Sequence, residues 1–170
     1  VVDKSVNGNV KATVRVTNNS SKDGLFRAEL YVNAPYTQYD RENKVEKSAI
    51  QFLNSAKVEV KAGQSQNVTI EVPTKYLASY DYTKAKTYVL DGGDYYFAIG
   101  NGSHEATNNV ITQMGKTGDM AGSSSKVKVW NNGSEADTDT VTFSKSKSGA
   151  QITNHLDSSD LNYYLDRKSV

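Results

Sequence analysis

Histidine and carboxylate side chains carry much of the acid–base and metal chemistry of proteins, and this chain offers few arrangements of them. Its two histidines, His104 and His155, are far apart in the sequence. A catalytic or zinc-binding histidine needs convergent partners, such as a second histidine or an orienting carboxylate. Glu105 is only a sequence neighbour of His104. We therefore interpret both histidines as surface or capping residues.

Two acidic segments resemble cation sites, because Ca²⁺ favours clustered oxygen ligands. Residues 91–94 read Asp-Gly-Gly-Asp but lack the rest of a calcium loop, and Asp-Gly is typical of a tight turn between strands. Residues 135–139 form an acidic run, which usually stays solvated. The chain has no cysteine, which excludes disulfides and thiolate zinc sites. We expect no metal and no cofactor.

Aromatic rings can stack on sugars, and Tyr36, Tyr39 and Trp130 are the candidates for this role. Two of them lie in a polar loop, residues 34–47, that is also rich in charges. Binding residues are often placed on loops that a rigid scaffold positions. The residues expected to contact a substrate or a neighbouring domain are Tyr36, Tyr39, Asp40, Arg41 and Lys44.

The composition limits the classes of partner. The chain has 170 residues and a formal net charge of +1, which does not favour a dedicated nucleic-acid surface. No apolar run approaches the ~20 residues that span a bilayer, so no membrane partner is expected. The chain begins at Val1 without an initiator methionine, and we expect it to be a mature or excised fragment. The compartment and the oligomeric state stay open.

Short alternating segments predict an all-β fold. Residues 10–17 alternate apolar and polar side chains, and so do residues 25–33 and 68–72. Further strands are expected at 49–53, 56–60, 87–90 and 95–99, with turns at 61–64 and 91–94 and a helical turn at 76–81. Repeated short strands at roughly ten-residue spacing favour a sandwich or a barrel.

The C-terminal part has a different character. A short helix is expected at residues 105–114 with Ser103 as its cap, followed by a Gly/Ser-rich loop at 115–125. The Asn-Gly dipeptide at Asn132 predicts a hairpin between strands 126–130 and 138–143. The tail from residue 144 is polar, and its large apolar side chains are Leu156, Leu161, Tyr163, Tyr164 and Leu165.

Five segments in order resemble the fibronectin-III-like domain of glycoside hydrolase family 3, the β-glucosidase and β-xylosidase family. They are residues 29–35 (ELYVNAP), 45–48 (VEKS), 62–70 (AGQSQNVTI), 76–81 (YLASYD) and 92–100 (GGDYYFAIG). The resemblance implies a fibronectin-III-like (immunoglobulin-like) β-sandwich. The family usually has Pro-Gly where this chain has Ala62-Gly63, and Gly-Phe where it has Leu53-Asn54. These two differences do not change the expected fold, but they leave the subfamily unassigned.

The resemblance also implies a domain organisation. Residues 1–104 would form the sandwich, 105–146 an extension of helix, loop and hairpin, and 147–170 a connector to a following domain. Residues 152–157 and 160–164 look like the connector of family members with permuted domain order, in which the sandwich precedes the catalytic barrel. Ser159-Asp160-Leu161 differs from the Ser-Asp-Trp-type nucleophile segment of the family, so Asp160 receives no catalytic role.

The resemblance implies that the chain is a non-catalytic accessory domain, with the catalytic domains of the same polypeptide as its partners. The parent protein would be a retaining β-glycosidase acting on β-linked glucosides or xylosides, and its two catalytic carboxylates would lie on other domains. The loop 34–47 would face a neighbouring domain or contact a β-linked saccharide. Two alternatives stay open: a carbohydrate-binding module and a cell-surface interaction module.

Overall fold

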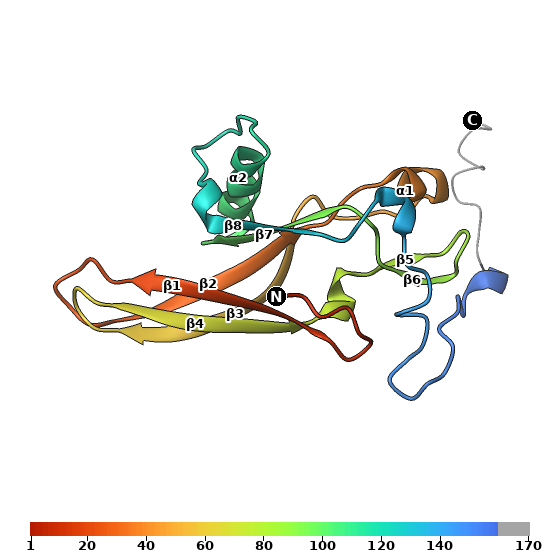
Figure 1. Cartoon of the computed structure of the whole chain (residues 1–170), viewed down its shortest axis with the longest axis horizontal. Coiled ribbons are helices and arrows are strands. Elements are labelled where there is room, and N and C mark those ends of the chain that lie inside the picture. Colours follow the sequence, from red (N-terminus) through yellow and green to blue (C-terminus); the bar gives the residue numbers. More distant parts are fainter. Residues whose placement is uncertain (160–170) are drawn as a thin grey trace.

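The computed structural model describes residues 1–159 and contains two packed antiparallel β-sheets (Figure 1). The smaller sheet pairs β1 (Asn9–Thr17) with β4 (Ser65–Pro73). The larger sheet has the strand order β3 (Gln51–Val60), β2 (Gly24–Asn33), β7 (Asp94–Gly100) and β8 (Val127–Asn131). The predicted all-β sandwich is confirmed.

The remaining elements are short. Strands β5 (Ser79–Asp81) and β6 (Thr87–Val89) form a ribbon, and the α-helices are α1 (Gln38–Asn43) and α2 (Ser103–Gln113). Four 3₁₀ turns are η1 (Thr74–Leu77), η2 (Ser124–Lys126), η3 (Glu135–Asp137) and η4 (Asp157–Ser159). Figure 1 shows α1 and the β5–β6 ribbon at one end of the molecule and α2 on the side of the larger sheet that faces away from β1 and β4.

The main core lies between the two sheets. In β1 and β4 every second side chain points inward, with Val10 opposite Val72 and Ala12 opposite Ile70. Leu30 and Val32 of β2 pack against them, each 1% exposed. The three alternating segments at 10–17, 25–33 and 68–72 therefore meet in one core, as their periodicity predicts.

A second apolar cluster lies on the outer face of the larger sheet, beneath α2. Tyr31 and Ala98 contribute from the sheet, and Ala106 and Val110 from the helix. Tyr31 is 5% exposed, although the strand pattern places it on the polar face. That prediction is wrong because a helix from elsewhere in the chain covers this face.

The two segments expected at 49–53 and 56–60 form one strand, β3. The β2–β3 register shifts between Leu30 and Tyr31, which marks a β-bulge. A bulge changes the phase of the alternation, so Leu53 and Ala56 both reach the core although they are three positions apart. The phase change made a continuous strand look like two.

Three local predictions are wrong. Residues 76–81 are not one helical turn, because η1 ends at Leu77 and β5 begins at Ser79. Strand β8 does not pair with residues 138–143 but with β7, placing Trp130 opposite Tyr95. Ser103 is the first residue of α2, and the N-cap is Gly102, which has no side chain to accept a hydrogen bond. Near this end of the helix the Asn101 N–H donates to the Glu105 carboxylate.

The segment after β8 is mostly irregular. It touches the sheets through a bridge between Leu90 and Asp139 and through buried Phe143. Leu156 is 70% exposed, and the connector segment expected at 160–164 lies outside the described part of the chain. None of the helices among residues 1–159 is long and apolar enough to cross a membrane.

Candidate functional site: a loop fixed by a buried ion pair

The loop between β2 and β3 is folded by its own polar side chains. Thr37 and Asp40 form a capping box: the Thr37 N–H donates to Asp40 Oδ2 over 2.8 Å, and the Asp40 N–H donates to Thr37 Oγ1 over 3.2 Å. Helix α1 ends at Asn43, and its C-cap residue Lys44 has a left-handed φ of 57°. The Val45 N–H then donates back to the Asp40 carbonyl over 2.9 Å. The chain therefore turns sharply and returns toward the sandwich.

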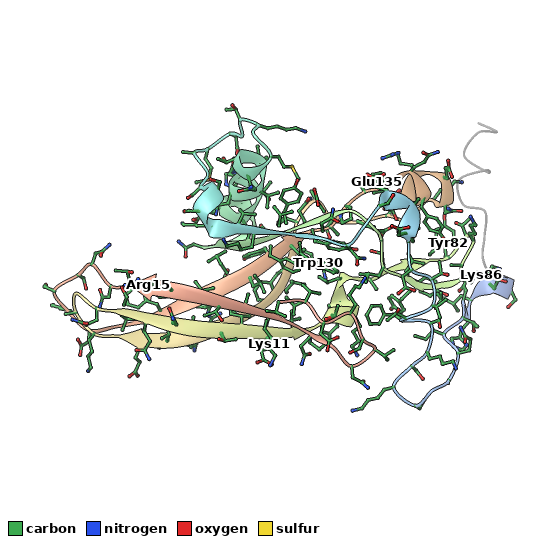
Figure 2. All side chains as sticks on the ribbon, viewed as in Figure 1. Lys11, Arg15, Tyr82, Lys86, Trp130 and Glu135 are labelled. Carbon is green, nitrogen blue, oxygen red and sulfur yellow. The ribbon has the colours of Figure 1, made fainter. Side chains whose placement is uncertain are left out.

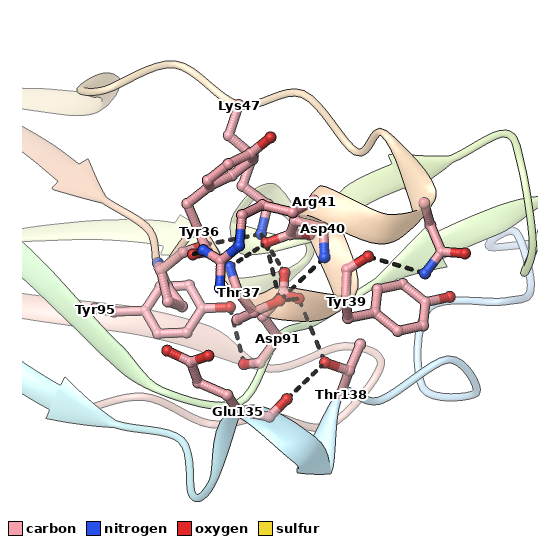
Figure 3. A network of polar contacts seen from close by, with 12 residues as sticks. Tyr36, Thr37, Tyr39, Asp40, Arg41, Lys47, Asp91, Tyr95, Glu135 and Thr138 are labelled. Atoms are coloured by element: carbon pink, nitrogen blue, oxygen red, sulfur yellow. Dashed lines mark hydrogen bonds and ion pairs between the residues drawn. The ribbon is translucent and has the colours of Figure 1, made fainter.

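A buried ionic network lies beneath this loop (Figure 3). Lys47 Nζ donates to Asp40 Oδ2 over 2.8 Å, to the Pro35 carbonyl over 3.0 Å, and to Asp91 Oδ2. The side chains of Lys47, Asp40 and Asp91 are 7%, 0% and 1% exposed. The network therefore joins both ends of the loop to the turn before β7.

The network contains two carboxylates and one ammonium group. Burial raises the pKa of the Asp91 carboxyl, the Asp40 charge adds to this rise, and Lys47 opposes it. Asp40 Oδ1 has no hydrogen-bond partner among the described residues. The charge of Lys47 therefore offsets the desolvation cost of burying both carboxylates.

Tyr39 also points into the structure. Its hydroxyl donates to Asp81 Oδ2 over 2.6 Å, and burial, with the Asp81 charge, raises the pKa of Tyr39. Burial would raise the pKa of Asp81, but the Tyr39 hydroxyl and three backbone N–H groups hold it below its ordinary value. Those N–H groups belong to Thr83, Lys84 and Ala85. Tyr39 thus anchors α1 to the β5–β6 turn.

The five predicted contact residues divide into two groups. Tyr36 is 46% exposed, and Arg41 and Lys44 are exposed as well. Arg41 Nη1 donates to the Tyr36 carbonyl over 3.0 Å, and its guanidinium lies 5.9 Å from the Tyr36 ring centroid. Asp40 and Tyr39 hold the loop from inside. The expectation that Asp40 makes an outward contact is wrong, because its side chain is fully buried.

A shallow pocket of about 500 Å³ opens beside Tyr36. Pro35, Tyr96, Met114 and Glu135 are among its lining residues, and Figure 2 shows Glu135 in the loop that follows β8. The turn before β7 and the segment after β8 lie in close contact because residue 92 is glycine. An added Cβ at this position would meet the Ser134 carbonyl oxygen at 1.6 Å. The strand pattern gave no sign of this pocket, because its walls come from distant segments.

Trp130 does not belong to this surface. Its ring centroid is 5.1 Å from that of Tyr95, and it packs half-buried against the main core. The Asn132 side chain donates to the Asp91 carbonyl over 2.8 Å, which fixes the chain after β8 against the ionic network. The expectation that Trp130 stacks on a sugar is not supported by this inward packing.

The other candidate groups have structural partners or are exposed. His104 Nε2 lies 2.8 Å from Asp119 Oδ2 at an exposed position, and His155 is exposed. Asp94 accepts a hydrogen bond from Asn131 over 2.8 Å. Among residues 1–159, no group of three or more His, Cys, Asp or Glu side chains could hold a metal ion.

Residues 28–103 match the model of the fibronectin type III-like domain family. The fold is similar to parts of solved β-glucosidases. β-Glucosidase 3B from Thermotoga neapolitana, solved with α-D-glucose, has 18% identity and a TM-score of 0.52, over 74% of this chain and 14% of that one. A GH3 β-glucosidase from Bifidobacterium adolescentis has 20% identity and a TM-score of 0.51, over 78% and 15%.

A β-glucosidase from Streptomyces venezuelae, solved with D-glucose, has 20% identity and a TM-score of 0.54, over 78% of this chain and 14% of that one. No curated protein sequence matches the chain. At these identities the likeness shows the fold, and the chain spans only about 14–15% of the length of these enzymes. The match of residues 28–103 to the fibronectin type III-like model agrees with the sandwich fold of the chain.

Proposed function

We propose that the chain is a non-catalytic accessory domain of a family 3 glycoside hydrolase that acts on β-linked glucosides or xylosides. The similarity to segments of solved β-glucosidases supports this role. The single observation that carries it is the exposed surface formed by Tyr36, Arg41 and Lys44 above a buried ionic network. We call these three residues the α1 surface.

The α1 surface has the properties of a domain contact. A mixed aromatic and cationic patch is typical of contacts between domains, which are more polar than a core. Arg41 is oriented by the Tyr36 carbonyl, so less side-chain freedom remains to be lost when a neighbour docks. The Lys47 network fixes the loop backbone below it. Such a surface can hold a catalytic domain in a defined position, and small misplacements of catalytic groups are costly in rate.

The chemistry of the chain agrees with a non-catalytic role. Retaining glycosidases place two carboxyl groups about 5–5.5 Å apart around an open sugar site. In the part of the chain that the structure describes, Asp40 and Asp91 lie together, are covered by the loop and share the ammonium group of Lys47. In this position they bind the loop to the sandwich and have no access to a glycosidic bond.

The test uses the enzyme that carries this chain. Arg41→Ala and Tyr36→Ala are expected to lower kcat/KM for an aryl β-glucoside or β-xyloside by about tenfold, because they loosen the docking of a catalytic domain. The matched control is Arg27→Ala, an exposed arginine on β2 remote from α1. Melting curves of the 170-residue chain should be the same for all three variants. Unchanged kcat/KM in both α1-surface variants would refute the docking role.

A carbohydrate-binding module is the second candidate, favoured by the pocket in which Tyr36 and Tyr96 lie together. It requires that cellobiose or xylobiose bind the isolated chain and that Tyr36→Ala remove this binding. The accessory-domain proposal expects no such binding and an effect only in the whole enzyme.

A further inference from the structure

A second pocket, of about 560 Å³, lies where the N-terminal residues 6–9, the η1 turn, strand β6 and residues 143–152 meet. It shares no lining residue with the pocket beside Tyr36. Phe143, which is buried, Ala78 and Ile152 are among its apolar lining residues. We call it the η1 pocket, and neither the sequence pattern nor the proposed function assigns it a role.

Two exposed tyrosines line the η1 pocket. Tyr76 is 50% exposed and Tyr88 is 41% exposed. Tyr88 packs edge-on against Tyr80 with ring centroids 5.3 Å apart, and the ammonium group of Lys75 lies 5.6 Å from the centroid of the Tyr76 ring. Gln51 Nε2 donates to the Tyr76 carbonyl over 3.3 Å, which fixes the backbone of this residue. Rings that are exposed yet positioned offer faces on which a sugar ring can stack with little loss of side-chain freedom.

The charge of the η1 pocket is of one sign. Lys75, Lys145 and Lys147 line it, and no acidic residue does. Within residues 1–159 none of these three lysines has a carboxylate within 4.0 Å, whereas Lys11, Lys61, Lys86 and Lys126 each form an ion pair. Three unneutralised ammonium groups around a concave surface attract an anion, even in a chain whose net charge is only +1.

The lysines of residues 143–152 are presented by an ordered turn. The Ser146 N–H donates to the Ala150 carbonyl over 2.8 Å, and the Ile152 N–H donates to the Ser144 carbonyl over 2.8 Å. Lys145 also forms a β-bridge with Gln151. The ammonium groups therefore extend from a fixed backbone that buried Phe143 anchors to the core.

The polar groups favour a sugar over a phosphate ester. Asn7, Asn9 and Gln51 line the pocket, and amide side chains both donate to and accept from hydroxyl groups. A phosphate site usually uses free backbone N–H groups at the start of a helical turn. Here η1 follows Pro73, which has no N–H, and the Thr74 N–H already donates to the Gly8 carbonyl over 2.9 Å.

We propose that the η1 pocket binds an anionic saccharide. A uronic-acid ring stacks on Tyr76 or Tyr88, its hydroxyls bind the amide side chains, and its carboxylate pairs with the lysines. This site does not depend on the accessory-domain role, because it uses none of the α1 surface.

The test is a titration of the 170-residue chain with tri-galacturonate, followed by NMR chemical shifts and calorimetry, with cellotriose as the neutral probe and AMP as the phosphate probe. Tri-galacturonate is expected to bind, to shift resonances of the η1 pocket, and to bind more weakly as salt rises. Tyr76→Ala and the double variant Lys145→Gln/Lys147→Gln should each weaken it by about tenfold.

The control is Lys57→Gln, an exposed lysine on β3. It should leave the affinity unchanged, and all variants should keep the melting temperature of the parent because the altered side chains are exposed. The proposal is overturned if tri-galacturonate does not bind, if cellotriose or AMP binds as tightly, or if both pocket variants retain the parent affinity.

Discussion

Lys47 Nζ lies 2.8 Å from Asp40 Oδ2 in an ion pair that is almost fully buried, between residues only seven positions apart. The same ammonium group contacts Asp91, which belongs to the turn before β7. One lysine therefore closes the α1 loop and attaches it to the sandwich. The exposed α1 surface depends on this buried contact for its position.

Replacement of Lys47 should be among the most damaging single changes near α1. Lys47→Met leaves Asp40 and Asp91 buried without a cation, and removal of one partner of a buried pair costs about 3–5 kcal/mol. Urea unfolding of the chain measures this loss. Lys44→Met, at an exposed position in the same loop, should change stability by less than about 0.5 kcal/mol. Equal stability of the two variants would contradict the role of the network.

The stability of the chain should fall with acid partly through Asp81. The pKa of Asp81 is lowered in the folded state, so the unfolded chain binds more protons in the window below about pH 5, and stability rises with pH there. The contribution of Asp81 is present above its unfolded pKa and lost as pH falls through its folded pKa.

Asp81→Asn tests this contribution. At pH 7 it should cost about 1–3 kcal/mol, because the amide replaces one acceptor oxygen by a donor facing backbone N–H groups. The difference from the parent chain should shrink between about pH 5 and pH 3. A difference that stays constant over this window, in denaturant titrations at each pH, would show that the charge of Asp81 does not stabilise the fold.

The core can be tested with two leucines of one strand. Leu30 is 1% exposed and Leu25 is 62% exposed, both on β2. Leu30→Asp buries an unpaired carboxylate and should unfold the chain or cost more than about 4 kcal/mol. Leu25→Asp should be nearly neutral. Fluorescence of Trp130, the single tryptophan, reports unfolding because its ring packs against this core. A Leu30→Asp chain with the same melting temperature as the parent chain would refute the core assignment.

The isolated chain should not hydrolyse aryl β-glucosides or β-xylosides. Its neighbouring carboxylates, Asp40 and Asp91, are buried around Lys47. A chromogenic assay checks this, with a β-glucosidase as the positive control. Turnover that survives repurification and disappears with a point substitution in the chain would overturn the accessory role.

Local patterns determined the class of fold. Side-chain alternation is a property of each strand by itself, so Val10, Leu30 and Ile70 were identifiable as core residues before their partners were known. Turn chemistry is equally local: the turn at residues 61–64 closes with the Gln64 N–H donating to the Lys61 carbonyl over 3.0 Å, and Gly63 has a φ of 67°. The polar loop at 34–47 was also recognisable from its composition.

The tertiary structure decided which strands pair, which faces are covered and which loop residues point outward. Strand β8 pairs with β7 and not with the residues after it, and α2 buries Tyr31 on a face that alternation marks as polar. Asp40 and Arg41 are adjacent in sequence, yet Asp40 turns inward because Lys47 and Asp91 are placed there by folding. Such choices depend on contacts between segments far apart in the chain, and no local periodicity encodes them.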